Sequence, residues 1–374
     1  MKNRYRKIIL FLCLLHKGIP AQAVNILNKV ELHKKKSGPE MGILSLYFSE
    51  KPNYQQANQK TNTLRDVLTF SFPLAKKDEQ VNPAIAQLNQ DTNQPYTISV
   101  DQNDAGITIS VIFDPNIVAV NVYDFYSIKK QKGVNITFIN KLILKEIDEK
   151  SRKTVLTTVS NKKPSTIVID CGHGGKDPGA FGFLGKAEKE VTLDVGLQVA
   201  QLLNKKGFKV AMTRKSDVDV ALSKRTTFAN LIPADLFISI HANASPNKTS
   251  KGIETYCLNY DLFHQSFSTL DNNSKLYIAQ LEIDRCNKSN KFANCIHEKT
   301  IQSVGAKKAA VDRSVRKDVT QVLLGTDMPA ALIEIGFISN EHEATLMFDK
   351  EYQHLLAQGI CNGIISYINS IKTV

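Results

Sequence analysis

Apolar and polar residues alternate in short runs between Met41 and about Asn140, a pattern typical of half-buried strands. The six runs are Leu44 to Phe48, Leu68 to Leu74, Tyr96 to Val100, Ile107 to Phe113, Val118 to Val122, and Ile136 to Phe138. Because little of this region has helical spacing, we predict a small antiparallel β-sandwich. Residues 52–65 and 76–93 are rich in Gln, Asn and Lys, which predicts long polar loops.

The pattern changes after residue 165. Ile167 to Ile169 form a continuous apolar run, as expected for a strand buried on both faces of a parallel sheet. The later segments are a helix over 191–202, a strand over 208–212, a helix over 222–231, a strand over 236–240, a strand over 330–335 and a helix over 352–371. This order predicts an α/β domain, a mostly parallel sheet flanked by helices. The polar residues 258–300 interrupt it, and we interpret them as an insertion carrying one or two helices.

The first residues have the pattern of an export signal. Four basic residues precede the apolar stretch 8–15, and Ala21-Gln22-Ala23 supplies small residues at a cleavage position. The alternative is a membrane anchor, but a span needs about 20 apolar residues and Lys17 interrupts this stretch. We therefore expect a signal peptide over 1–23, no stable membrane span after cleavage, and a periplasmic protein. Its parts would be a β-sandwich over 24–146, a charged, hydroxyl-rich linker over 147–165 and an α/β domain over 166–374.

Charge and cysteine content add little to this prediction. Loss of residues 1–23 removes five basic residues and lowers the formal net charge from +12 to +7, which suits a polyanionic partner such as cell-wall polymer. No nucleic-acid motif is present, so we expect no nucleic-acid partner. Five cysteines remain without CxxC spacing, which indicates neither a disulfide framework nor a cysteine zinc site. Only Cys286 and Cys295 are a candidate disulfide pair.

Polar residues that suit metal chemistry lie where strands end, the place where open α/β sheets bind ligands. His173, between glycines, follows the first strand, His241 ends the third, and Glu188 precedes the first helix. Two imidazoles and one carboxylate leave one position of a catalytic zinc ion open for water. Glu334 lies within an apolar strand, where a carboxylate costs free energy unless it is paired or placed at the open sheet end, and it is a candidate base.

Each of these signals has a structural alternative. A histidine at a strand end is commonly a hydrogen-bonded structural residue. A glutamate before a helix commonly stabilises the helix dipole. Glu190 is close enough to Glu188 to take either role. From the residues alone this choice stays open.

Several ordered blocks resemble a known family. They are Ile169 to Ala180, Glu188 to Leu193, Thr213-Arg214 with Asp217, Leu222 and Arg225, Ala229-Asn230, Ala234 to Asn243, and Pro329 with Glu334 to Asn340. With them, residues 166–371 resemble the zinc-dependent N-acetylmuramoyl-L-alanine amidases of the Gram-negative periplasmic and sporulation type. The resemblance implies Zn2+ as cofactor, His173, Glu188 and His241 as its ligands, and Glu334 as the catalytic residue. The substrate would be peptidoglycan, cut between the lactyl group of N-acetylmuramic acid and L-alanine, in wall remodelling and daughter-cell separation.

The resemblance also bears on the remaining segments. Residues 24–146 are loosely similar to the AMIN-like β domains that direct such enzymes to the cell wall; an unrelated β module is the alternative. In relatives switched by an activator protein, an inserted helix covers the zinc, and residues 258–300 occupy the matching position. Glu282 or Asp284 would then block the metal, unless the segment is an ordinary surface excursion. Cys171 stands where the family usually has proline, and we expect an inert small residue there.

Two other functions fit the same residues. A zinc carboxypeptidase-like enzyme that acts on stem peptides would use similar ligands. A catalytically silent wall-binding protein could keep the fold, although such a protein has no need of an open zinc site.

Overall fold

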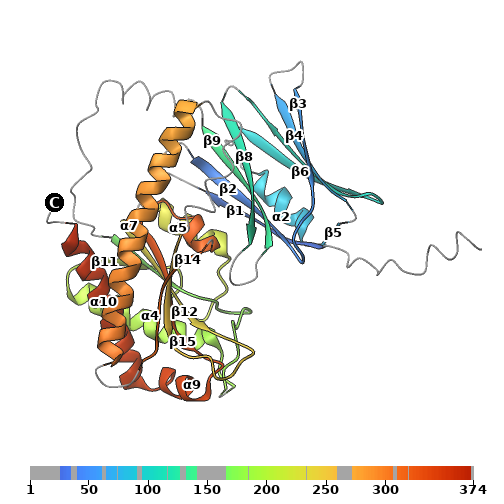
Figure 1. Ribbon diagram of the computed structural model, residues 1–374. Coiled ribbons are helices and arrows are strands. Elements are labelled where there is room, and N and C mark those ends of the chain that lie inside the picture. Colours follow the sequence, from blue (N-terminus) through green and yellow to red (C-terminus); the bar gives the residue numbers. More distant parts are fainter. Residues whose placement is uncertain are drawn as a thin grey trace, which may run out of the picture.

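The structure, a computed structural model, consists of an all-β part and an α/β part (Figure 1). It describes residues 26–34, 40–60, 65–73, 75–90, 95–115, 117–126, 132–140, 166–183, 185–232, 234–258, 272–305, 310–318 and 320–371. The predicted signal peptide and the predicted linker lie outside these residues.

The all-β part has two sheets packed face to face around a shared apolar core. One sheet has the order β5-β1-β2-β9-β8, with β1 (Ile26–Lys34), β2 (Glu40–Phe48), β5 (Lys76–Lys77), β8 (Val118–Tyr126) and β9 (Lys132–Asn140). The other has the order β3-β4-β7-β6, with β3 (Gln55–Lys60), β4 (Asp66–Pro73), β6 (Tyr96–Asn103) and β7 (Gly106–Phe113). Each of the six predicted strands is present, and the neighbouring strands are antiparallel except β1 with β5.

The two predicted polar loops are wrong in part. Strand β3 has the polar sequence QQANQK and lies at a sheet edge, where it pairs with β4 along its whole length. The second segment contains β5 and the helix α2 (Val81–Leu88). The polar strand β3 has no apolar pattern to reveal it, because strand formation depends on the neighbouring strand as much as on the sequence. Helix α2 has Val81, Ile85 and Leu88 at helical spacing, a short signal that the surrounding Gln, Asn and Lys residues obscured.

The α/β part is built on a six-stranded sheet with the order β11-β10-β12-β15-β13-β14. Its strands are β10 (Thr166–Cys171), β11 (Lys209–Met212), β12 (Leu236–Asn243), β13 (Ile253–Leu258), β14 (Asp312–Asp318) and β15 (Ala330–Phe337). The strands β11, β10, β12 and β15 are parallel, whereas β13 is antiparallel to β15 and carries β14 as a parallel edge strand. The predicted fold class is confirmed.

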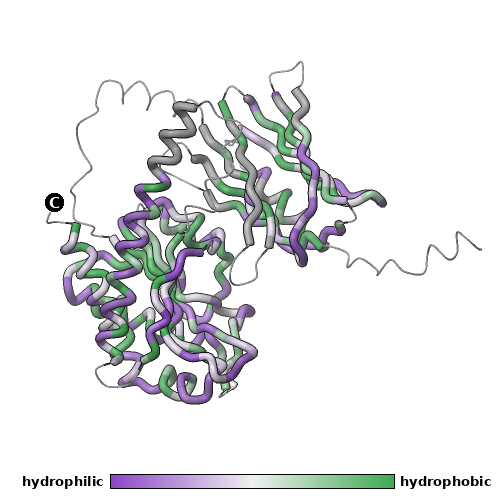
Figure 2. Tube along the Cα trace, in the orientation of Figure 1, coloured by the Kyte–Doolittle hydropathy of each residue, from purple (hydrophilic) through white to green (hydrophobic). Residues whose placement is uncertain are grey.

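Helices cover both faces of this sheet. On one face α4 (Glu188–Lys205), α7 (Asn272–Gly305) and α10 (Lys350–Ser370) enclose the main apolar core. On the other face α5 (Leu222–Leu231) and α8 (Gln321–Leu324) pack together with Ile43 and Tyr47 of the β-sandwich. The short helix α9 (Glu341–Met347) follows β15. Figure 2 shows the apolar segments gathered in the central strands and in the helix faces that pack on them. In the described ranges, no helix combines the length and apolar character that a membrane span requires.

The predicted insertion over residues 258–300 is largely a core element. Phe292, Ala293 and Ile296 of α7 are fully buried in the main core against α10 and the sheet. These three residues form an apolar stripe along one face of α7. The stripe is hard to recognise in the sequence because the other faces of the helix carry many Asn, Ser and Lys residues. Residues 259–271 lie outside the described part of the chain.

The predicted blocking carboxylates lie away from the metal site. The Ser289 hydroxyl on α7 accepts a hydrogen bond from the Ala330 N–H at the first residue of β15, which fixes this part of α7 at the amino end of the sheet. Glu282 lies two turns further out and is paired with Arg285, whose guanidinium also donates to the Thr326 carbonyl. The exposed Asp284 pairs with Lys288 on the same helix. The blocking role predicted for Glu282 or Asp284 is therefore wrong.

The candidate disulfide is also wrong. Cys286 and Cys295 are both free thiols, as are the three other cysteines that the structure describes. They lie nine residues apart on one continuous helix, about 13 Å along its axis, which is too far for a disulfide.

Candidate metal centre

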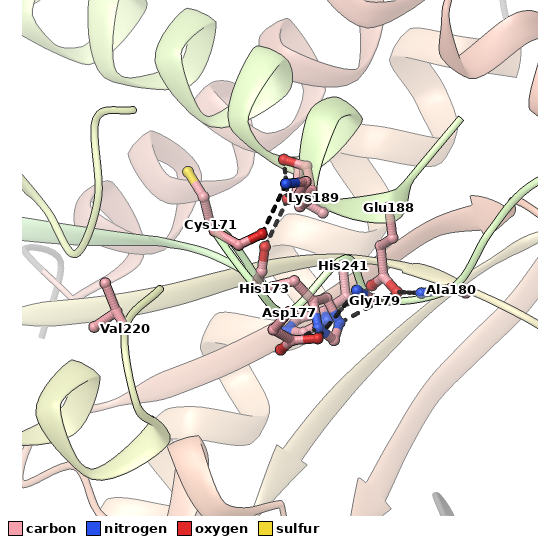
Figure 3. Close-up of polar contacts among 12 residues, drawn as sticks. Cys171, His173, Asp177, Gly179, Ala180, Glu188, Lys189, Val220 and His241 are labelled. Carbon is pink, nitrogen blue, oxygen red and sulfur yellow. Dashed lines mark hydrogen bonds and ion pairs between the residues drawn. The ribbon is translucent and has the colours of Figure 1, made fainter. Parts of the chain in front are cut away.

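Three side chains from separate segments converge at the carboxyl end of the parallel strands. They are His173 after β10, Glu188 at the start of α4 and His241 near the end of β12, and their ligand atoms all lie within 4.8 Å of one another. His173 Nε2 is 3.2 Å from Glu188 Oε2, and His241 Nδ1 is 3.0 Å from Glu188 Oε1. Figure 3 shows both rings pointing toward the glutamate. The three predicted ligands are thus together in one place.

Each ligand is held by a second contact. His173 Nδ1 lies 2.8 Å from Asp177 Oδ2, so the carboxylate fixes which ring nitrogen faces Glu188. The two oxygens of Glu188 accept backbone hydrogen bonds of 3.0 Å from the N–H groups of Ala180 and Ala242. Glu190 instead accepts a hydrogen bond from the Ala187 N–H and serves as the helix cap. The structure therefore places Glu188 in the site and Glu190 outside it.

The glycine-rich loop brings the backbone close to the ligands. A Cβ atom at Gly172 would lie 2.4 Å from the His241 ring, and one at Gly179 would lie 2.7 Å from Glu188 Oε2. His173 itself has a φ of 60°, a left-handed conformation that costs free energy in a residue with a side chain. The fold accepts this cost at the residue whose ring must turn toward Glu188. Glycine at these positions therefore has a steric reason.

Two buried arginines clamp the same loop. Arg214 donates to the carbonyl oxygens of Cys171 and Gly172, and Arg225 donates to those of Cys171 and His173. Arg225 also pairs with the fully buried Asp170 at 2.8 Å. Both arginines stand in the sequence blocks that carry the family resemblance, but no role was predicted for them. A further signal is that they follow apolar segments, where a buried charge needs a partner.

Cys171 is the inert residue that we expected. Its side chain is fully buried against Gly196 of α4 and points away from the metal ligands (Figure 3). Burial raises the pKa of its thiol to about 12, so the sulfur stays protonated at neutral pH.

Glu334 is fully buried in β15 and lies directly beside the metal centre in the sheet. Its Cα pairs in register with His241 on the parallel neighbour β12. Residues that pair across neighbouring strands point to the same face, so the two side chains leave the sheet together. This position fits the role predicted for Glu334.

Electrostatics favour a charged carboxylate at the centre. Burial raises the pKa of Glu188, but its hydrogen bonds with His173 and His241 and their charges outweigh burial and hold the pKa well below its usual range. For His173, burial lowers the pKa. The hydrogen bond to Glu188 and the charges of Glu188 and Asp177 outweigh burial, so the pKa of His173 is raised. Both histidines thus interact with an anionic partner that a cation could share.

The donor set fits zinc. The two histidine nitrogens approach different oxygens of Glu188, at 3.2 and 3.0 Å, and one ligand atom from each of the three residues lies within 4.8 Å of the others, near enough to share one ion. Two nitrogens and one carboxylate leave the fourth position open, which is the arrangement of a catalytic ion. The Asp177 contact on the outer nitrogen of His173 is the support that metal-binding histidines commonly have.

Comparison with known proteins identifies the α/β part. The family model of N-acetylmuramoyl-L-alanine amidases matches residues 167–366. The chain belongs to this amidase family. It is 35% identical to the N-acetylmuramoyl-L-alanine amidase LytC of Bacillus subtilis over 57% of this chain and 38% of LytC. It is 33% identical to the germination-specific amidase of Bacillus subtilis over 54% of this chain and 78% of that protein.

Among solved structures, the catalytic domain of the amidase CwlV from Bacillus (Paenibacillus) polymyxa var. colistinus is similar to this chain. The two are 32% identical, the match covers 55% of this chain and 98% of that domain, and the TM-score is 0.46.

For this amidase-family chain we expect Asp177→Asn to weaken metal binding. The neutral amide holds the His173 ring less firmly and no longer raises its basicity, so affinity for zinc should fall about 10-fold in a chelator competition titration. Asp219→Asn is the matched control, because Asp219 is in a nearby loop and pairs with Lys176. An unchanged affinity in Asp177→Asn would contradict the supporting role of Asp177.

Proposed function

We propose that this chain is a zinc-dependent N-acetylmuramoyl-L-alanine amidase that hydrolyses the lactyl–L-alanine amide bond of peptidoglycan in the periplasm. One observation carries the proposal: a His-Glu-His ligand group with an open position lies beside a buried carboxylate, Glu334, on the neighbouring strand. Membership in the amidase family supports the choice of bond. A role in daughter-cell separation is part of the same proposal.

The residues divide the reaction between holding the ion and moving a proton. When bound, zinc supplies a Lewis acid that activates water near neutral pH and polarises the amide carbonyl. Asp177 and the N–H groups of Ala180 and Ala242 keep His173 and Glu188 in place. Glu334 takes the proton of the attacking water and returns it to the alanine nitrogen, which would otherwise leave as a poor anion. A buried position keeps this proton within the site.

The remaining parts of the chain would serve export and targeting. We assign residues 1–23 to a cleaved signal peptide, 24–146 to an AMIN-like wall-targeting domain, 147–165 to a linker and 166–374 to the catalytic domain. Amino-terminal sequencing of the exported protein should begin near Val24; an uncleaved chain would contradict the signal peptide.

The function is tested by digesting purified peptidoglycan with and without a chelator and analysing the products by mass spectrometry. We expect metal-dependent release of peptides with a new amino-terminal alanine. Release of a carboxyl-terminal amino acid would instead identify a carboxypeptidase-like enzyme. Binding of the protein to peptidoglycan without any released peptide would identify a silent wall-binding protein.

A further inference from the structure

Three acidic or basic side chains form a row across the sheet at the metal end. Glu334 on β15 pairs in register with His241 on β12 and, on its other side, with Glu254 on β13. All three therefore point to the same face of the sheet. Strands are about 4.8 Å apart, so Glu254 is one strand spacing beyond the proposed proton-transfer residue.

Glu254 is buried and joins the row to the edge strand β14. One of its oxygens accepts hydrogen bonds from Asn243 Nδ2 and from the Tyr256 hydroxyl, the latter at 2.7 Å. The other oxygen is 3.0 Å from Arg313 Nε and 3.3 Å from Arg316 Nε. Two arginines thus share one oxygen of a single carboxylate.

A bulge in β14 brings both arginines to the same face. Residues three apart on a regular strand point to opposite faces, yet Arg313 and Arg316 contact the same oxygen of Glu254. The register between β13 and β14 shifts at this point, and Ser314 has a φ of 67°. A left-handed serine costs free energy, and bulges that redirect a side chain are frequent beside active sites. The strained bulge therefore places Arg316 on the same face of the sheet as Arg313.

The two guanidinium groups remain accessible although their partner is not. The Glu254 side chain is 3% exposed, whereas those of Arg313 and Arg316 are 32% and 42% exposed. The Arg313 guanidinium also lies 4.9 Å from the centre of the Phe337 ring at the end of β15, which holds it at the metal end of the sheet. Figure 2 shows β14 as a mostly hydrophilic strand, and it forms the sheet edge.

The order of the strands sets the direction of the substrate. The metal ligands lie on the β10 and β12 side, and in the proposed reaction Glu334 on β15 protonates the departing nitrogen. The group attached to that nitrogen, which is the stem peptide, therefore extends from β15 toward β13 and β14. The alanine nitrogen and the α-carboxyl carbon of the next stem residue are five covalent bonds apart, roughly 6 Å in an extended chain, and an extended arginine side chain covers what remains of the two strand spacings between β15 and β14.

We propose that Arg313 and Arg316, set by Glu254, form a binding site for a carboxylate of the stem peptide, the one on the residue that follows alanine. This proposal rests on the amidase function. Arginine suits the role because its planar fork binds a carboxylate through two parallel hydrogen bonds. Glu254 is a positioning residue: it orients both side chains through their Nε atoms and does not itself contact the substrate.

The test uses two soluble glycan–peptide substrates that differ at one group. The residue after alanine is D-glutamate with a free α-carboxylate in one and D-isoglutamine, its neutral amide of the same shape, in the other. We expect the native enzyme to favour the acid substrate about 10-fold in kcat/KM. This value lies in the lower part of the range of free energies for a hydrogen bond to a charged group, because the arginines are partly exposed. In Arg316→Gln, where Arg313 remains, this preference should fall several-fold through a higher KM for the acid substrate, whereas kcat for the acid and kcat/KM for the amide should stay as in the native enzyme.

Two further variants separate binding from folding. Lys317→Gln removes the same charge from the next residue of β14, which is exposed, and should keep the preference. Arg316→Lys keeps the charge without the planar fork and should retain part of it. Equal rates for both substrates in the native enzyme, or an equal loss on both in Arg316→Gln, would overturn the site while leaving the amidase proposal intact. Failure of the native enzyme to release alanine-peptide from either substrate would overturn both.

Discussion

Glu334→Gln is expected to bind zinc as the native protein does and to lose about 10²- to 10⁴-fold in kcat on peptidoglycan. Glutamine has nearly the same shape and fills the same buried position in β15. It cannot take a proton from water or return it to the alanine nitrogen, so only the chemical step is affected. The measurement is kcat from released amino-terminal alanine, together with metal content after dialysis.

Two comparisons make this result specific. His241→Ala should lose both metal and turnover, since it removes one of the three converging ligands. Glu343→Gln changes another buried glutamate near β15, whose oxygens accept hydrogen bonds from the Gly252 and Phe337 N–H groups, and it should keep kcat. Normal turnover in metal-loaded Glu334→Gln would refute the proton-transfer role. Loss of the metal in that variant would make Glu334 a part of the binding site instead.

The sequence predicted four of the six strands of the α/β sheet, of which β10, β12 and β15 are buried on both faces, and it missed β13 and β14. Runs such as Ile167 to Ile169 are apolar without interruption, and the helices between them carry a clear stripe. A histidine after such a strand is commonly structural when taken alone, but Glu334 inside an apolar strand requires a partner or an open sheet end, and the family resemblance joins the two signals. These signals are local, so they could be read without knowing the fold.

The contacts that hold the site could not be predicted in the same way. Arg214 and Arg225 reach the loop of His173 from segments about 40 and 50 residues later, and nothing in their local sequence shows which carbonyl they bind. Asp177 is easier to connect with His173, because it lies only four residues later in the sequence. Its contact with the ring nevertheless depends on the left-handed φ of His173, which the sequence does not show. The blocking role predicted for Glu282 or Asp284 failed for a different reason. The polar composition of residues 258–300 hid the buried stripe of α7, while residues 259–271 lie outside the described part of the chain.

Removal of Arg225, the buried arginine that supports the loop of His173, should have a large effect on stability. Arg225→Gln is expected to lower the free energy of unfolding by about 3–5 kcal/mol at pH 7, because it leaves the Asp170 carboxylate charged and buried without its cation. It also removes the donors to the carbonyl oxygens of Cys171 and His173, so zinc affinity should fall as the loop loosens. Denaturant unfolding followed by circular dichroism measures the first effect, and a chelator titration the second.

The pH dependence of this loss tests its cause. In the native protein burial raises the pKa of Asp170, but Arg225 and the hydroxyls of Thr213 and Ser239 outweigh burial and lower this pKa. The Asp170 carboxylate therefore stabilises the fold at pH values above its unfolded pKa. This contribution is lost as the pH falls through the folded pKa. Without Arg225 burial prevails and the pKa rises, so the carboxyl group of the variant takes up a proton at mildly acidic pH and loses its penalty. The difference in the free energy of unfolding between native and variant protein should therefore shrink from pH 7 to pH 5.

Lys224→Gln, which removes an exposed charge from the adjacent position of α5, should show neither the loss of stability nor its pH dependence. A difference for Arg225→Gln that stays constant across this range would mean that packing of the side chain, and not the buried charge of Asp170, accounts for the stability.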